Sequence, residues 1–375
     1  MEKRRMARMK QFKKIFQAVK VPLLAILCSL IVGGIIIAIT GSNPFRAYYA
    51  LLQGSGLAPK GSYAGHKSML TDFMSYVNYF TPMIFAALAV AVALRAGLFN
   101  IGVSGQMLAA GFTASVIVGY SELNAVIAKP LVIVIGIVVG GLAGALIGFL
   151  KYKFNINEVV SSIMLNYIFQ YVVSFFINTY FVDPVSRQSK EISKASRLTL
   201  MDTMVGDLKM DIPLGIILAL LTVYLVWFLL EKTKLGYELK AVGFSRSAAK
   251  YAGIRVGKSM VLSMTVSGAL AGLAGVTYYL GYVGSIQPKV LISTGFDAIA
   301  VSLLGNNNPF GIVFSTMLIT MIGKGGTYMK SAAGVDAEIA SVITGIILLF
   351  SACNVYIKWK MEAKKRENTS AKEEK

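Results

Sequence analysis

The stretch PLVIVIGIVVGGLAGALIGFL, residues 130–150, contains no charged residue. As a helix rising 1.5 Å per residue, it is long enough to cross a hydrocarbon layer about 30 Å thick. Backbone groups in lipid must pair within their own segment, and the ten-residue alternation of β-barrel strands is absent, so the stretch predicts a membrane helix. The other uncharged stretches of similar kind are 21–45, 73–94, 96–121, 159–182, 212–230, 259–288, 298–323 and 339–357.

The composition supports a membrane protein and excludes a soluble domain. Hydrophobic residues make up 55% of the chain, charged residues 15%, and the mean hydropathy is +0.65. The net charge of +19 would suggest nucleic acid in a soluble protein, but the basic residues gather at 1–20, 231–258 and 358–375. The positive-inside rule places these three segments in the cytoplasm and the loops 40–72 and 182–212 outside. No nucleic-acid partner is expected.

The number of crossings follows from this topology. Nine crossings cannot leave both termini in the cytoplasm. One of the nine stretches must therefore contain two membrane segments, or one must fail to cross the membrane. Gly305-Asn-Asn-Asn-Pro309-Phe-Gly311 is the best candidate for a break inside 298–323, because Pro and Gly end helices. We therefore predict an all-α, polytopic membrane helical bundle of about ten segments, one or two of them short or broken. Eight segments is the alternative.

The bundle forms one domain over residues 21–357, between a basic cytoplasmic N-terminus, 1–20, and a charged cytoplasmic tail, 358–375. His66 is the single histidine, so His-based metal sites and Ser-His triads are excluded. No GxxxxGK[ST] phosphate loop occurs either. We expect no catalytic residues, no metal and no nucleotide site in this chain. Cys28 and Cys353 both fall in predicted spans, so no disulfide framework is implied.

Polar residues inside or beside the predicted spans are candidates for a substrate pathway. Three glycines within ten residues, 97–106, together with amide and hydroxyl side chains, predict a broken or closely packed helix start. On a helix beginning near Asn157, the residues at 158, 162 and 166 share one face. The candidates are Asn100, Ser104, Gln106, Glu158, Ser162, Asn166, Tyr167, Asp297 and Asn306. Helix packing, or capping for the two acids, is the alternative for these side chains.

Glycines spaced by four residues form small-residue faces at Gly140, Gly144 and Gly148, and again at Gly268 and Gly272. Such faces let helix backbones approach closely in membranes. We expect them to pack helices within the chain, with a subunit interface as the alternative.

The basic loop 231–258 contains a short amphipathic helix with two adjacent alanines, whose small side chains could enter a groove of a partner. We predict that it couples the chain to a separate motor protein; a solvated basic linker is the alternative. The coupling residues are Gly243, Arg246, Ser247, Ala248, Ala249, Lys250 and Gly253.

Three motifs carry a family resemblance: residues 97–107, residues 157–167 and residues 297–305. They resemble the permease subunits of bacterial ABC importers, in the branch for simple sugars and nucleosides that is related to branched-chain amino acid permeases. Two departures occur: Ser104 stands where relatives have glutamate, and Ser247 replaces the acid of the importer coupling pattern.

The resemblance implies a multi-pass protein of the bacterial cytoplasmic membrane with three kinds of partner. A cytoplasmic ATPase would dock on the coupling loop and hydrolyse ATP with Mg, an extracellular lipoprotein would deliver substrate, and a second, paralogous permease would complete a heterodimer. The docking surfaces for the lipoprotein would be the loop at 182–212 and the loop at 40–78, with the aromatic residues Tyr48, Tyr49, Tyr63, Phe73, Tyr76 and Tyr79. An interfacial belt is the alternative for these aromatic residues.

The resemblance favours nucleosides as the substrate. Simple sugars such as ribose or galactose, and branched-chain amino acids, are the alternatives. An ion-coupled secondary transporter is the rival class. It would need several buried acids or histidines, and only Glu158 and Asp297 lie in suitable places.

Overall fold

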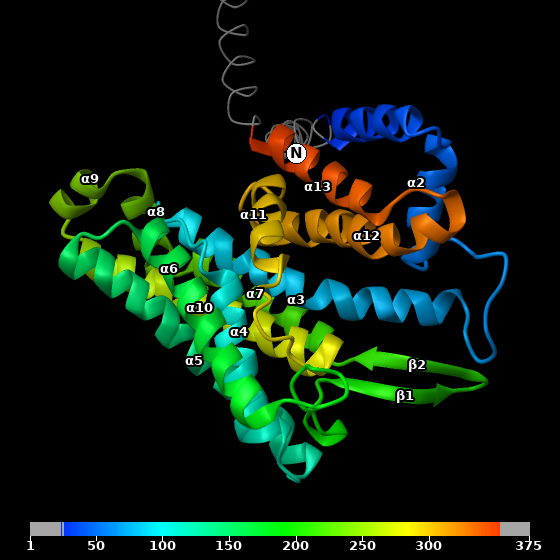
Figure 1. Cartoon of the computed structure of the whole chain (residues 1–375). Coiled ribbons are helices and arrows are strands. Elements are labelled where there is room, and N and C mark those ends of the chain that lie inside the picture. The colour runs from blue at the N-terminus through cyan, green and yellow to red at the C-terminus, as the bar shows by residue number, and fades with distance from the viewer. Residues whose placement is uncertain (1–23, 25, 353–375) are drawn as a thin grey trace, which may run out of the picture. The chain divides into compact units, whose positions relative to one another are not determined.

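The computed structural model describes residue 24 and residues 26–352, and most of this part is helical (Figure 1). The helices are Ile26–Ile39, α2 (Pro44–Gly54), α3 (Met69–Arg95), α4 (Val103–Ala114), α5 (Ala125–Phe154), α6 (Glu158–Phe176), α7 (Gly215–Lys232), α8 (Lys234–Phe244), α9 (Arg246–Tyr251), α10 (Val256–Thr277), α11 (Thr294–Leu304), α12 (Pro309–Ala333) and α13 (Ala337–Ala352). The π-helical turns η1 (Ser115–Gly119), η2 (Ile177–Phe181) and η4 (Tyr278–Val283) extend α4, α6 and α10, and η3 (Lys194–Ser196) is a 3-10 turn.

The helical membrane architecture is confirmed. Six helices of the described residues are long and apolar enough to cross a membrane, a seventh span results if the pair Ile26–Ile39 and α2 counts as one, and three shorter apolar helices accompany them. The choice between ten and eight segments, the orientation of the termini and the single domain over 21–357 stay predictions. The basic N-terminus 1–20 and the tail 358–375 lie outside the described residues.

The predicted break inside 298–323 is present. α11 ends at Leu304 and α12 begins at Pro309. Asn306 and Asn307 have φ of 55° and 52°, in the left-handed region that asparagine tolerates better than most residues. Asn308 Oδ1 accepts the backbone N–H of Phe310 at 3.0 Å and so caps the start of α12. The asparagines therefore build a tight turn between two helices.

The all-α prediction is wrong for the loop 182–212. Strands β1 (Thr199–Val205) and β2 (Leu208–Pro213) form an antiparallel hairpin, in which Thr199 pairs with Pro213 and Val205 with Leu208. The two residues between the strands are Gly206 and Asp207, and Gly206 has φ of +60°. A glycine followed by aspartate between two runs of strand-forming residues is a known hairpin signal.

The chain packs into two compact units, Leu52–Gly325 and the described residues on either side of it. In the larger unit, α10 has its most extensive contacts with α5, followed by α3 and α4. Figure 1 shows α5 and α10 running side by side. Glycines permit this approach: a Cβ on Gly140 would lie 2.3 Å from the Gly268 carbonyl oxygen, and one on Gly272 would lie 1.8 Å from that of Gly136. The small-residue faces therefore pack α5 against α10, as the spacing predicted.

In the other unit, the predicted span 21–45 is not one straight helix. The helix Ile26–Ile39 and α2 are bent by 114° where they meet. The Tyr48 hydroxyl donates to the Leu30 carbonyl across the bend, and Gly33 packs against Ile343 of α13.

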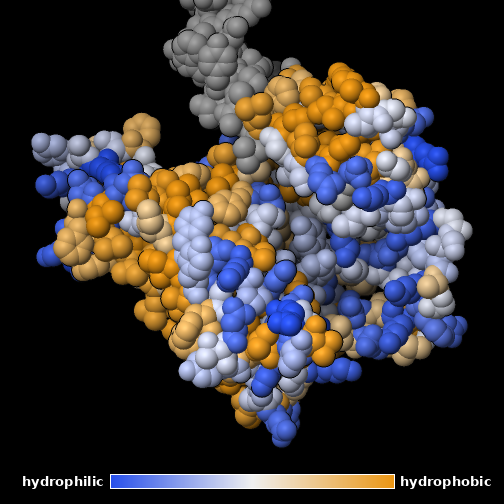
Figure 2. Space-filling view, viewed as in Figure 1, coloured by the Kyte–Doolittle hydropathy of each residue, from blue (hydrophilic) through white to orange (hydrophobic). Residues whose placement is uncertain are grey.

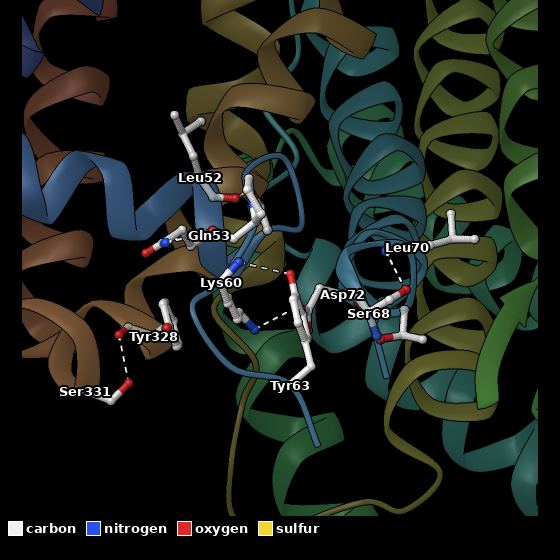
Figure 3. Close-up of polar contacts among 12 residues, drawn as sticks. Leu52, Gln53, Lys60, Tyr63, Ser68, Leu70, Asp72, Tyr328 and Ser331 are labelled. Atoms are coloured by element: carbon white, nitrogen blue, oxygen red, sulfur yellow. Dashed lines mark hydrogen bonds and ion pairs between the residues drawn. The ribbon is translucent and has the colours of Figure 1, made fainter. Parts of the chain in front are cut away.

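The loop before α3 is anchored by polar contacts (Figure 3). Lys60 Nζ lies 2.7 Å from Asp72 Oδ2 and stands over the Tyr63 ring, 5.8 Å from its centroid. The Ser68 hydroxyl accepts the N–H of Leu70 and caps α3. Because α3 begins at Met69, it includes Tyr76 and Tyr79, which therefore belong to a long apolar helix. The prediction that grouped these two residues with the outer loop is wrong.

Candidate functional site

Two helices of the larger unit begin in the interior instead of at its ends. Residues 96–102 are not helical, and α4 begins at Val103, which confirms the broken helix start. Irregular backbone also precedes α11, from Gly284 to Ser293. The two starts meet: Ser104 Oγ donates to the Ile292 carbonyl at 2.9 Å, and a Cβ on Gly295 would lie 2.3 Å from Ser104 Oγ. Helix starts of this kind, with irregular backbone buried in protein, are typical of transporter interiors.

Asn100 organises the break before α4. Its Nδ2 donates to Gln106 Oε1 at 3.0 Å and to Ser267 Oγ at 2.9 Å, and its Oδ1 accepts the N–H of Gly102. Ser267 Oγ in turn donates to the Ala89 carbonyl of α3 at 2.7 Å. Asn100, Gln106 and Ser267 are all buried. The network therefore ties α3, α4 and α10 together and satisfies the polar groups that the break leaves without a helical partner.

Asn166 of α6 binds the same segment from the other side. Its Oδ1 accepts the N–H of Gly105 at 2.8 Å, and its Nδ2 donates to the Ile101 carbonyl at 3.0 Å. Ser162, one turn earlier, is fully buried and lies against Gly102. Both side chains thus hold the irregular segment in place, which is the helix-packing alternative considered for them.

The structure does not bring the remaining candidates into this cluster. Glu158 pairs with Lys151 of α5, 3.0 Å apart, at the start of α6. Tyr167 is 54% exposed on α6, and Asn306 is exposed in the turn after α11. Asp297 Oδ2 accepts a hydrogen bond from Ser293 Oγ in the first turn of α11. For all nine candidates, contact with substrate stays a prediction.

Sequence reasoning missed a second polar group, in which three tyrosines adjoin a lysine. Tyr79 of α3 contacts Tyr282, with ring centroids 5.2 Å apart, and Tyr278 lies 6.0 Å from the same ring. Lys324 Nζ of α12 donates to the Tyr282 hydroxyl at 3.2 Å. Lys324 was missed because the uncharged stretch was closed at 323, although α12 continues through it to Ala333.

The predicted coupling loop folds into α8 and α9, which confirms the short helix. Ser245 caps α9 by accepting the N–H of Ala248, and Gly253 follows it with φ of +78°. Gly243 packs on the backbone of Arg95 and Gly97, and Arg246 donates to the Gly97 carbonyl at 3.3 Å.

The two alanines have different environments, contrary to the expected exposed pair. Ala248 is exposed, whereas Ala249 is 3% exposed and belongs to a buried cluster with Leu98 and Ile147. The surface around Ala248 instead presents Phe244 and Tyr251, each 94% exposed. Large apolar side chains with this exposure mark an interaction surface.

A basic groove adjoins α9. It encloses about 590 Å³ and is lined by Lys151, Tyr152, Asn155, Arg246, Lys250, Ile254, Arg255, Val256, Gly257, Lys258 and Met260. Figure 2 shows hydrophilic residues gathered at the α8–α9 end, in contrast to the hydrophobic surface over much of α5 and α6. The loop therefore offers a positively charged surface with exposed aromatic side chains.

Comparison with known proteins decides the family. A family model described as branched-chain amino acid transport system / permease component matches residues 73–352. The chain belongs to this family.

Relatives extend the similarity beyond the matched region. The permease is 36% identical to the guanosine ABC transporter permease protein NupP of Bacillus subtilis, over 93% of this chain and 97% of that protein. It is 34% identical to the nucleoside ABC transporter permease protein NupB of Lactococcus lactis, over 90% and 92% of the two chains. The glucose ABC transporter permease protein TsgB13 of Haloferax volcanii is 27% identical over 90% and 88%. The resemblance to ABC importer permeases is confirmed, and the chain is a multi-pass protein of the cytoplasmic membrane.

Proposed function

We propose that this permease carries nucleosides inward across the cytoplasmic membrane as one of two membrane subunits of an ABC importer. The observation that carries the proposal is the end-to-end similarity to permeases named for guanosine and for nucleosides. A simple sugar is the second candidate, because a more distant relative is named for glucose.

A cytoplasmic ATPase is proposed to supply the energy, with ATP and Mg bound by that partner. The geometry of α8 and α9 supports this step. Phe244 at the end of α8 and Ala248 and Tyr251 of α9 are exposed, and a basic groove adjoins α9. Gly243 and Arg246 connect these two helices to the segment before α4. A displacement of α9 by the ATPase would therefore reach the interior of the permease.

A second permease and an external lipoprotein complete the proposed assembly. Asp297 and Lys324 are only half-buried within this chain, although their helices are apolar. A charge facing lipid at this depth costs on the order of 3 kcal/mol. A second membrane subunit, with a passage between the two, would remove these groups from lipid. We expect that subunit to be a paralogue and the lipoprotein to deliver substrate on the outer side.

Uptake in a host without its own nucleoside carriers tests the proposal. The host would express this chain with its partner ATPase, second permease and lipoprotein, and accumulation of radiolabelled guanosine would be measured. Unlabelled nucleosides should compete, whereas ribose, glucose and leucine should not. Competition by a sugar and by no nucleoside would show that the substrate is a sugar and not a nucleoside. Accumulation driven by a sodium or pH gradient in ATP-free vesicles would refute the ATPase-driven mechanism.

A further inference from the structure

The tyrosine group of the larger unit lies at one depth in the bundle. Arg95, at the end of α3, donates to the Asn307 carbonyl just before α12, so these two ends share a level. At 1.5 Å per residue, Tyr79 lies about 24 Å along α3 from that level, and Lys324 lies about 22 Å along α12. A direct contact also shows that Tyr79 lies close to this part of α12: a Cβ on Gly323, the residue before Lys324, would lie 3.3 Å from the Tyr79 hydroxyl oxygen.

Asp297 lies on α11, closer to the level of Arg95 and Asn307 than the tyrosines do. It precedes the end of α11 at Leu304 by seven residues, about 10 Å along the helix, and α11 packs against α3. Tyr79, Tyr282 and Lys324 come together from three separate segments, whereas Asp297 lies about 14 Å from Tyr79 along the bundle by the same measure.

This region is a surface that does not suit lipid. Tyr79, Tyr278, Tyr282 and Lys324 are all half-buried, so each presents part of its side chain outward. An intramembrane charge faces a polar cavity or another protein chain in nearly all known cases. The helices with lipid-like surfaces are α5, α6 and α7, whose exposed residues include Leu142, Phe175 and Leu221. The tyrosine region therefore faces the route of the substrate or the second permease along it.

We propose that Tyr79, Tyr278 and Tyr282, with Lys324, form a binding station for a nucleoside within the permease. The inference rests on the proposed function and adds to it a site, because delivery by a lipoprotein alone requires no binding by the membrane subunit. A base stacks on tyrosine rings regardless of its identity.

Lys324 sets the preference for the base. The Tyr282 hydroxyl and ring hold its ammonium over the tyrosine group, at 3.2 Å from the oxygen and 5.2 Å from the ring centroid. An ammonium donates hydrogen bonds and accepts none. Guanine presents two adjacent acceptors, O6 and N7, where adenine presents one acceptor and a donor. The station therefore favours guanosine over adenosine.

Equilibrium binding to the assembled complex tests the station. The complex of this permease with the second permease and the ATPase is placed in lipid nanodiscs without the lipoprotein, and binding of radiolabelled guanosine is measured with adenosine and 2′-deoxyguanosine as competitors. Lys324→Met should weaken guanosine binding about tenfold and adenosine binding much less. Tyr282→Leu should weaken the binding of all three ligands, because each base stacks on the same rings.

Matched controls separate the station from general damage. Tyr171→Leu removes a tyrosine that is 64% exposed on α6, and Lys129→Met removes a lysine from the start of α5; neither should change binding. If Lys324→Met does not assemble, Tyr282→Phe removes only the hydroxyl that orients the lysine and should lower the guanosine preference in the same direction.

The outcomes distinguish the two proposals. A wild-type complex that imports guanosine in cells but binds none without the lipoprotein would overturn the station and leave the proposed function intact. If the Lys324→Met and Tyr282→Leu variants bound guanosine with wild-type affinity and selectivity, this would also overturn the station. A wild-type complex that imports no nucleoside would overturn both.

Discussion

Replacing Gly272 by alanine should loosen the pair formed by α5 and α10. The new Cβ would lie 1.8 Å from the Gly136 carbonyl oxygen, which belongs to helical backbone and cannot rotate away. The helices would have to separate by about 1.5 Å to restore an ordinary contact distance, and a gap of that size forfeits much of the dispersion energy along the seam. Overpacking of this kind costs about 1–3 kcal/mol.

Gly141→Ala is the matched control on the same seam. Its Cβ would lie 3.7 Å from the nearest neighbouring atom, the Ala269 Cβ, which is an ordinary contact. Both substitutions gain the same helix propensity, about 1 kcal/mol, so the difference between them isolates the packing cost. In a thermal-stability assay that follows the monodisperse detergent-solubilised peak, Gly272→Ala should melt roughly 5 °C below Gly141→Ala. Equal midpoints would refute the argument that backbone contact holds this seam.

The other predictions concern the coupling loop, the break before α4 and the outer loop. Ala248→Glu should abolish ATP-dependent uptake with normal membrane insertion, whereas Ala249→Trp should instead lower thermal stability, because Ala249 is buried; the reverse pattern would contradict the assignment. Asn166→Leu leaves the Gly105 N–H and the Ile101 carbonyl without their side-chain partner, so stability should fall by about 1–3 kcal/mol for each group left unpaired; an unchanged melting midpoint would show that water replaces the amide. Hydrogen bonds from Ser186 and the Val185 N–H lower the pKa of Asp183 below its usual value. A lowered pKa stabilises the folded turn at pH values above the ordinary carboxylate pKa, and this contribution is lost only as the pH falls through the lowered value. Exchange protection of the Val185 and Ser186 amides should therefore be constant from pH 8 down to about pH 5, and a loss of protection near neutral pH would contradict it.

The broad fold could be predicted because each decisive feature is local. Uncharged runs, the Gly-Asn-Asn-Asn-Pro turn at 305–309 and the four-residue glycine spacing act within one or two helical turns. The hairpin at 199–213 was not predicted, because the loop was interpreted from its charges and not from the alternation of apolar and polar residues along it. Its Gly206-Asp207 turn was visible in the sequence.

The site could be predicted only in part, because its geometry depends on which segments meet. Asn100 and Asn166 were identified as polar residues in apolar surroundings, but their shared contact with residues 101–105 is a tertiary fact. The same holds for Ala249, whose burial depends on Leu98 from the non-helical segment 96–102 and on Ile147 of α5. Lys324 has no local signal beyond one charge near the end of a hydrophobic run, and its meaning comes from Tyr282, forty-two residues earlier.

The contacts of the larger unit indicate where movement can occur. The glycine seam makes α5 and α10 a stiff pair, since neither backbone can shift without a clash against the other. By contrast, residues 96–102 are held by side-chain hydrogen bonds from Asn100 and Asn166, which can break and re-form at lower cost than packed backbone. The coupling loop touches this weaker segment directly, through Gly243 and through the hydrogen bond from Arg246 to the Gly97 carbonyl. A push on α9 would therefore move the start of α4 against a fixed α5–α10 pair. Because α4 and α11 meet at Ser104 and Ile292, such a movement would also reach the helix that carries Asp297.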